Sequence, residues 1–87
     1  MKRNQPALEE TAGLARALAH PARIRVLAML REGELCVCHI TSVLGLAPST
    51  VSSHLRELRL AGLIEQRRDG RWIHVRLADA EAGHPWL

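Results

Sequence analysis

The sequence predicts a single domain over residues 1–87 that belongs to the α+β class, mainly helical and ending in a β-hairpin. Two observations support this prediction. Leu, Ile, Val and Ala provide most of the apolar residues, and Phe and Tyr are absent, which suits a core of packed helices. Apolar residues recur at helical spacing as far as residue 60 and alternate with polar residues after it. A chain of this size builds only a modest core and often gains stability from a partner subunit.

Two helices are predicted in the N-terminal part, at residues 7–19 and 21–31. The apolar face of the first helix is rich in alanine, so another helix could approach it closely. Pro21 disfavours helical geometry at the residue before it and suits the first turn of the second helix, which Gly33 ends. The side chains expected to point inward from the second helix are Ile24, Leu27, Ala28 and Met29 or Leu30.

A short helix at residues 40–44 and a longer helix at about 48–60 are predicted on either side of a turn that contains Gly45. The buried face of the longer helix is formed by residues spaced four and three apart, Val51, Leu55 and Leu58. Its other face, with the flank of that face, carries Ser49, Thr50, Ser53, His54 and Arg56. A short helix, a turn and a second helix together predict a helix-turn-helix over about 40–60.

A β-hairpin is predicted for residues 63–77. The segments 63–68 and 71–77 alternate in polarity, and the Asp69-Gly70 pair between them is typical of a two-residue hairpin turn. A hairpin attached directly to a helix-turn-helix makes a winged helix-turn-helix, in which the hairpin is the wing. The arginines beside the tip of this wing are Arg67, Arg68 and Arg71.

The excess positive charge of the chain lies in one segment. Residues 48–77 hold six arginines and three acidic residues, whereas the rest of the chain holds six basic and six acidic residues. This segregation favours contact with a polyanion. Small polar groups on a helix reach base edges in the major groove, and arginines on a wing reach phosphates or the minor groove. The predicted contacts to double-stranded DNA are Ser49, Thr50, Ser53, His54, Arg56, Arg67, Arg68 and Arg71.

Two of these residues also have ordinary structural interpretations. Ser49 could cap the N-terminus of its helix, because a serine hydroxyl accepts a hydrogen bond from the backbone there. His54 could pack beside Leu58, since half-buried histidines are common.

The cysteines of the chain, Cys36 and Cys38, lie together in the segment ELCVCHI at residues 34–40. No apolar run is long enough to cross a bilayer and no signal-peptide pattern is visible, so we expect a cytoplasmic protein with reduced thiols. Side chains two residues apart on a helix diverge by about 200°. Chelation of one atom by both thiols therefore requires that this segment be non-helical or that it unwind.

Two thiols suit some ligands better than others. Structural zinc takes four ligands, so a soft, thiophilic centre that accepts three sulfurs is a better match. The third ligand could be a small thiol, a water or His39, and two chains could together offer four thiols to a larger metal. The cysteines could instead be small buried hydrophobes. They could also oxidise, although a disulfide across one intervening residue is expected to be strained.

The chain resembles the ArsR/SmtB family of metal-responsive bacterial repressors in HPARIRVLAML (20–30), GELCVCHI (33–40) and STVSSHLRELRLAGLIEQRRDGRWIHVRL (49–77). The resemblance is closest to the arsenite-responsive members with an ELCVC motif. It implies a homodimer that binds operator DNA without a cofactor and leaves it when an inducer binds Cys36 and Cys38. The implied inducer is As(III) or Sb(III), or in a related branch Cd, Pb or Zn.

Three departures from the family pattern leave the inducer open. The position of a third cysteine in many arsenite sensors is Thr41 here, and residues 1–20 lack the cysteines of the cadmium and lead branch. The zinc branch has ligands on a C-terminal helix, where this chain offers only Asp79 and His84. That helix also belongs to the family's dimer interface, so we expect either that the helix at 7–19 carries more of the interface or that the chain has been cut short before its C-terminal dimerisation helix.

The other functional classes fit the sequence less well. Oxidation of the two thiols is an alternative signal on the same fold. A small redox enzyme or a metal carrier would leave the DNA-binding half without a role, and no catalytic base is evident, so we do not expect an enzyme. The operator sequence and the regulated genes do not follow from the chain.

Overall fold

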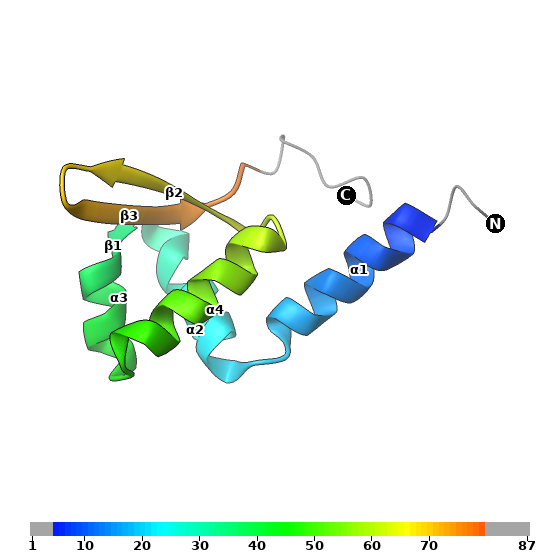
Figure 1. Ribbon diagram of the computed structural model, residues 1–87, viewed down its shortest axis with the longest axis horizontal. Coiled ribbons are helices and arrows are strands. Elements are labelled where there is room, and N and C mark those ends of the chain that lie inside the picture. Colours follow the sequence, from blue (N-terminus) through cyan, green and yellow to red (C-terminus); the bar gives the residue numbers. More distant parts are fainter. Residues whose placement is uncertain (1–4, 80–87) are drawn as a thin grey trace.

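The fold is described for residues 5–79 by a computed structural model and is the winged helix-turn-helix that the sequence predicts. Its elements follow in the order α1 (Gln5–Leu18), α2 (Pro21–Met29), the short 3-10 helix η2 (Leu30–Glu32), β1 (Leu35–Cys36), α3 (Val37–Leu44), α4 (Pro48–Leu60), β2 (Ile64–Asp69) and β3 (Trp72–Leu77). In Figure 1 the sheet lies above the helices α2, α3 and α4, and α1 extends away from them. The predicted ligand position His84 lies outside the described residues.

The ends of the helices follow from local sequence. His20 is extended, with φ −142° and ψ 121°, which is the geometry that the residue before a proline prefers. Gly45 ends α3 in the left-handed region, with φ +66°, where a residue without a Cβ has no steric penalty. The chain turns there and enters α4 at Pro48, as predicted.

The core lies between α2, α3, α4 and the inner face of the sheet. Helix α4 buries Val51, Leu55 and Leu58, as its spacing predicts. The predicted inward face of α2 is right in part: Leu30 is buried and Leu27 and Met29 pack against the core, whereas Ile24 is 53% exposed and Val26, which was not predicted, is buried. Almost every position from 26 to 30 is apolar, so periodicity could not fix the rotation of this helix, which its packing against α4 decides.

The sheet has three antiparallel strands in the order β1-β3-β2, one more than predicted. Strand β1 pairs Leu35 with Val75 and Cys36 with His74. The hairpin turn is displaced by one residue from the prediction, because Asp69 pairs with Trp72 and leaves Gly70 and Arg71 as the loop. Gly70 has φ +63°, which suits the first position of a type II′ turn.

Helix α1 contacts the rest of the domain only near its C-terminal end, where Ala17 is buried. Near the other end Leu8 is 66% exposed. The extension of α1 makes the molecule elongated, with dimensions of 45 × 23 × 21 Å. Within residues 5–79 no helix has both the length and the apolar character needed to cross a membrane.

Candidate DNA interface and thiol site

The sulfur atoms of Cys36 and Cys38 meet where β1 passes into α3. Cys36 is extended, with φ −71° and ψ 142°, and it caps α3 by accepting a hydrogen bond on Sγ from the Cys38 backbone N–H at 3.3 Å. The structure pairs the two cysteines as a disulfide with a Cα–Cα distance of 5.2 Å, which lies within the ordinary range for disulfides.

The helix that follows the thiols starts earlier than predicted. It begins at Val37 instead of residue 40, because the Cys36 sulfur and the pairing of Cys36 in β1 provide a cap at that point. Only Cys38 of the pair is helical, so both sulfurs reach one point without any unwinding. Chelation of one atom by both thiols was expected to need non-helical backbone, and the extended backbone of Cys36 is sufficient for it.

An open groove of about 440 Å³ adjoins the thiols. Pro48 at the start of α4 and Trp72 and Ile73 of β3 line it. Thr41, at the position of the absent third cysteine, also lines the groove and donates a hydrogen bond from Oγ1 to the Val37 carbonyl at 2.8 Å. The thiols, the start of α4 and the wing thus meet at one place.

A third protein ligand for a metal is not present in the part of the chain that the structure describes. Over residues 5–79 no three His, Cys, Asp or Glu side chains gather closely enough to hold an ion. His39 is exposed on α3 and does not form such a cluster with the thiols. Residues 5–79 therefore offer a soft ion the sulfur atoms of Cys36 and Cys38 as ligands.

Helix α4 exposes most of the polar side chains predicted to face DNA. Ser49, Thr50, Ser53 and Arg56 are exposed. Ser52, which the sequence interpretation omitted, is exposed as well and lines a groove between α4 and the sheet together with Arg56. Its spacing of three residues from Ser49 is the signal that could have revealed it.

His54 does not lie on that exposed face, which corrects its predicted DNA contact. Its residue exposure is 7%, and its Nδ1 atom accepts a hydrogen bond from Arg23 Nε at 3.1 Å. The ring of His20 lies against it, with centroids 4.6 Å apart. Burial lowers the pKa of His54, and the neighbouring His20 and Arg23 lower it further. The residue joins the α1–α2 junction to α4.

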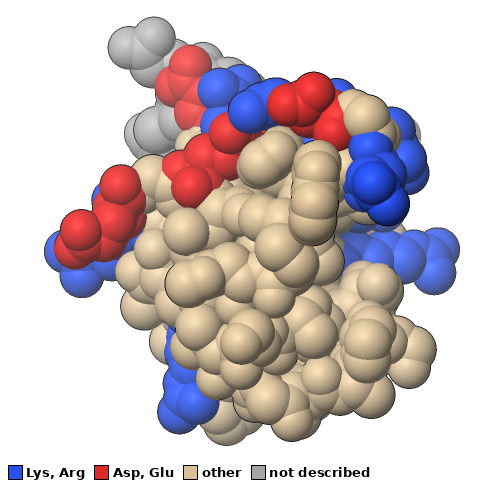
Figure 2. All heavy atoms as spheres, turned by 90° about the vertical axis from the view of Figure 1, so that its left-hand side faces the viewer, with Lys and Arg blue, Asp and Glu red and all other residues tan. Residues whose placement is uncertain are grey.

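The helix-turn-helix end of the molecule carries almost no charge. Residues 35–55 contain no Asp, Glu, Lys or Arg. Figure 2 shows this end, where uncharged side chains fill the middle and most of the lower part, and charged side chains lie along the upper edge, at the wing, and at the outer edges of the view. Contacts of this end with a polyanion must therefore rely on hydroxyl, imidazole and backbone N–H groups.

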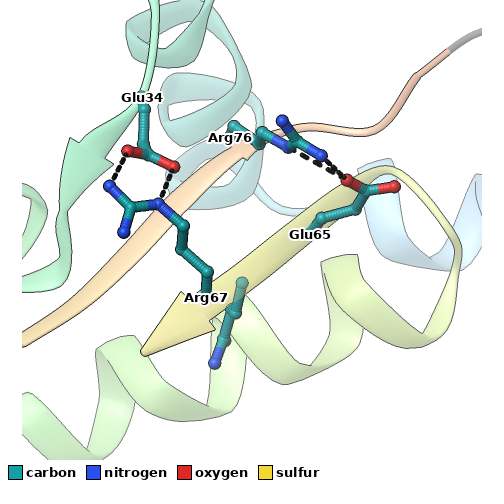
Figure 3. Close-up of a pocket in the computed structure, with 5 residues that line it drawn as sticks. Glu34, Glu65, Arg67 and Arg76 are labelled. Carbon is teal, nitrogen blue, oxygen red and sulfur yellow. Dashed lines mark hydrogen bonds and ion pairs between the residues drawn. The ribbon is translucent and has the colours of Figure 1, made fainter. Parts of the chain in front are cut away.

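Three of the arginines in the basic segment are engaged within the domain. Arg67 donates from Nε and Nη2 to both carboxylate oxygens of Glu34, at 3.0 and 2.8 Å (Figure 3). This contact lowers the pKa of Glu34 and raises that of Arg67. Arg76 pairs with Glu65 across the hairpin at 2.8 Å, and Arg59 donates to Gln66 Oε1 at 2.7 Å.

The pairing of Arg67 changes the predicted set of phosphate contacts. To reach DNA, Arg67 would have to leave Glu34, so its predicted role is weakened. Within residues 5–79, Arg56, Arg68 and Arg71 have no carboxylate partner. Within the basic segment, these three side chains supply positive charge that is available to a polyanion.

Comparison with known proteins agrees with this architecture. Residues 20–66 match the family described as bacterial regulatory protein, arsR family. The chain is 46% identical over 63 residues to the arsenic resistance transcriptional regulator ArsR1 of Pseudomonas putida, an alignment that covers 71% of this chain and 49% of that protein. It is 39% identical over 77 residues to the transcriptional repressor SmtB of Mycobacterium tuberculosis, covering 88% and 57%. The chain thus spans about half the length of the curated relatives it matches.

A solved structure shows the same fold. The homodimeric winged helix-turn-helix DNA-binding domain Mb0332 of Mycobacterium bovis superposes with a TM-score of 0.86 at 32% identity, covering 93% of this chain and 75% of that one. These relatives are transcriptional regulators and not enzymes. With the family match over more than half of its length, the chain belongs to the ArsR/SmtB family of helix-turn-helix regulators.

Proposed function

We propose that this chain is a cytoplasmic, homodimeric transcriptional repressor that leaves its operator DNA when As(III) or Sb(III) bonds to Cys36 and Cys38. The observation that carries the proposal is the convergence of the two sulfurs at the start of α3, the first helix of the helix-turn-helix. The same point is joined to the wing, because Cys36 pairs with His74 of β3. A ligand held there acts on both DNA-binding elements.

The proposed DNA contacts divide between α4 and the wing. Helix α4 presents small hydroxyl groups, which fit a major groove where they reach base edges and phosphates. Arg68 and Arg71 at the wing tip reach neighbouring phosphates, and Arg56 extends the contact along α4. No cofactor takes part in this binding. The contacting residues we propose are Ser49, Thr50, Ser52, Ser53, Arg56, Arg68 and Arg71.

The proposed dimer interface is α1. Its exposed side includes Leu8, Ala12 and Ala15, and small side chains let a second helix approach closely. The structurally similar domain Mb0332 from Mycobacterium bovis is a homodimer. A dimer binds two half-sites whose spacing must match the turn of the DNA helix, so the angle between two α1 helices sets the spacing of two α4 helices.

The proposed inducer chemistry is a ligand exchange. Arsenous acid, As(OH)₃, loses two hydroxides to the protons of two thiols, so two As–O bonds break, two As–S bonds form and two waters leave. Arsenic stays trivalent. The thiolate is the nucleophile in each exchange. The disulfide seen in the structure must first be reduced by a small thiol, which becomes a disulfide itself.

Release from DNA follows from the geometry of the thiols. An arsenic atom bonded to both thiols fixes the separation of two sulfurs that belong to different elements, Cys36 to β1 and Cys38 to α3. This displaces the start of α3 and the end of β1, and with them the helix-turn-helix relative to the dimer axis. Couplings between ligand sites are typically about 5- to 150-fold in affinity, which is enough to empty an operator.

The test is fluorescence anisotropy with labelled DNA from the chain's own promoter, with the protein kept reduced by a phosphine. We expect binding at about 0.1 M salt and release by arsenite or antimonite. The protein without inducer, on a scrambled DNA of equal length, is the control for sequence-independent binding. A protein that does not bind its own promoter better than the scrambled DNA is not its repressor.

Two alternatives share the fold and are separated by the same titration. Release by zinc, cadmium or lead but not by arsenite would assign the thiols to a different metal, with further ligands from the second chain. Release by peroxide, reversed by a thiol, would assign them to an oxidation signal. The disulfide pairing of Cys36 and Cys38 is the observation that favours oxidation as the second candidate.

A further inference from the structure

The groove beside the thiols has walls that a purely inorganic ligand does not need. Except for Thr41 and Arg71 these walls are apolar, formed by Val37, Pro48, Trp72 and Ile73. Trp72 is 53% exposed, so its ring offers accessible apolar surface next to the sulfurs. Apolar and aromatic walls with a few placed polar groups are typical of small-molecule sites.

The two thiols leave one bond of trivalent arsenic without a partner among residues 5–79. Arsenic(III) forms three bonds, and Cys36 and Cys38 provide two of them. No cluster of three ligating side chains occurs within residues 5–79. Thr41 Oγ1 lies in the groove, but its proton is donated to the Val37 carbonyl. An arsenic atom that already carries a carbon substituent needs only two sulfurs.

We infer that the preferred ligand of this site is an organic trivalent arsenical, R–As(III), with both thiols on arsenic and the substituent R in the groove against Trp72. The inference rests on the proposed function, because it assigns a ligand class to the same two thiols. A cavity of about 150 Å³ is enough to bind benzene in an engineered protein, so the groove of about 440 Å³ has room for a phenyl or small alkyl group.

The bonding step balances without any change of oxidation state. For the acid form R–As(OH)₂, two As–O bonds break and two As–S bonds form with Cys36 and Cys38. Each thiol proton leaves with one hydroxide as water, and the As–C bond stays intact. A protein that starts in the disulfide form needs two electrons from a small thiol or a phosphine, and the oxidised reductant is the by-product.

The experiment compares phenylarsonous acid with arsenous acid by isothermal titration calorimetry on the full chain. DNA is left out, and a phosphine keeps the thiols reduced without competing for arsenic. We expect one arsenic per chain for both compounds and affinity about tenfold or more higher for the phenyl compound, from burial of its ring. Equal affinities would overturn the inference while leaving the proposed function intact. Binding of neither compound would overturn the proposed function itself.

Trp72→Ala tests the role of the groove. It is expected to lower the affinity for phenylarsonous acid about tenfold and to leave that for arsenous acid within about twofold. The unchanged arsenous acid affinity is the internal measure of an intact fold. Leu60→Ala, which removes an apolar side chain that is 67% exposed at the end of α4, is the matched control and should change neither. An equal loss for both compounds in Trp72→Ala would overturn the inference.

Thr41→Cys tests the open coordination position. A third thiol in the groove should raise the affinity for arsenous acid by about tenfold or more and leave the phenyl compound within about twofold, since its third bond is to carbon. An equal rise for both compounds would show that the open position is not what limits arsenous acid, and would overturn the inference. Binding of phenylarsonous acid by the Cys36→Ser, Cys38→Ser double variant with unchanged affinity would overturn it as well.

Discussion

Two neighbouring stretches of this chain differ sharply in their number of charged residues. Residues 35–55 hold the thiols, α3 and the first half of α4 without one Asp, Glu, Lys or Arg. Residues 56–76 hold the rest of α4 and the wing with six arginines and three acidic residues. The neutral stretch can interact with DNA only through short-range contacts such as hydrogen bonds. The basic stretch attracts the phosphates electrostatically, over a distance that shrinks as the salt concentration rises. Recognition and attraction are thus assigned to different parts of one interface.

The largest expected effect is the loss of the response to arsenite when a thiol of the neutral stretch is replaced. Cys36→Ser should abolish release by arsenite and leave operator affinity within about twofold, because serine also caps a helix well and preserves the start of α3. Anisotropy with and without arsenite measures both quantities. Cys38→Ser is the companion variant, and full release by arsenite in either would contradict a site that needs both sulfurs.

The next largest effect is expected on the salt dependence of DNA binding, when arginines of the basic stretch are removed. The double variant Arg68→Ala, Arg71→Ala should flatten the dependence of log affinity on log salt by about 0.9 for each phosphate that no longer meets an arginine, or about 3.6 for a dimer. Operator affinity from about 50 to 300 mM salt gives the slope. Arg67→Ala is the matched control, since its guanidinium is held by Glu34, and it should change the slope far less. An equal change would show that Arg67 leaves Glu34 to meet DNA.

A smaller effect is expected on sequence preference, when a hydroxyl of the neutral stretch is removed. Ser53→Ala removes one hydroxyl from the exposed face of α4, and the loss of one such hydrogen bond costs about 1 kcal/mol. This should reduce the preference for the promoter over scrambled DNA about fivefold for each half-site of the dimer, with the salt slope unchanged. A changed slope with unchanged preference would instead make Ser53 a phosphate contact without sequence information.

The smallest effect concerns the histidine that joins the two ends of the fold. Because the pKa of His54 is lowered in the folded state, the unfolded chain binds more protons below the ordinary histidine range. Stability should therefore be full above about pH 6.5 and fall as the pH drops through the lowered folded value. Urea midpoints between about pH 8 and 5 measure this. His54→Gln keeps an acceptor for Arg23 and should give a flatter curve, whereas superimposable curves would contradict the lowered pKa.

Much of the fold could be predicted because its signals are local. Pro21 and Gly45 act on their own backbone, and Val51, Leu55 and Leu58 appear at one helical spacing with polar residues between them. Helix α2 lacked that contrast, so its predicted inward face was right at Leu30 and wrong at Ile24. Strand β1 has two residues, too few for any alternation to be visible, and it exists only because β3 pairs with it.

The candidate site was less accessible to sequence reasoning, because its corrections come from distant contacts. Arg67 and Glu34 are 33 residues apart, and Arg23 and His54 are 31 apart. The sequence around Arg67 and around His54 gives no indication of these distant partners. The thiols were assigned from their spacing and from the resemblance to the ArsR/SmtB family, whereas the groove that joins them to Trp72 could be found only in the fold.

The shortness of β1 has a consequence for the dose at which the proposed sensor responds. Two residue pairs join β1 to β3, whereas six join β2 to β3, so the link between thiols and wing is the weaker of the two. On the proposed mechanism, the inducer concentration that empties half of the operators depends on this link as well as on sulfur chemistry. A substitution at Leu35 that loosens or tightens the pairing would shift that threshold and leave both ligands in place.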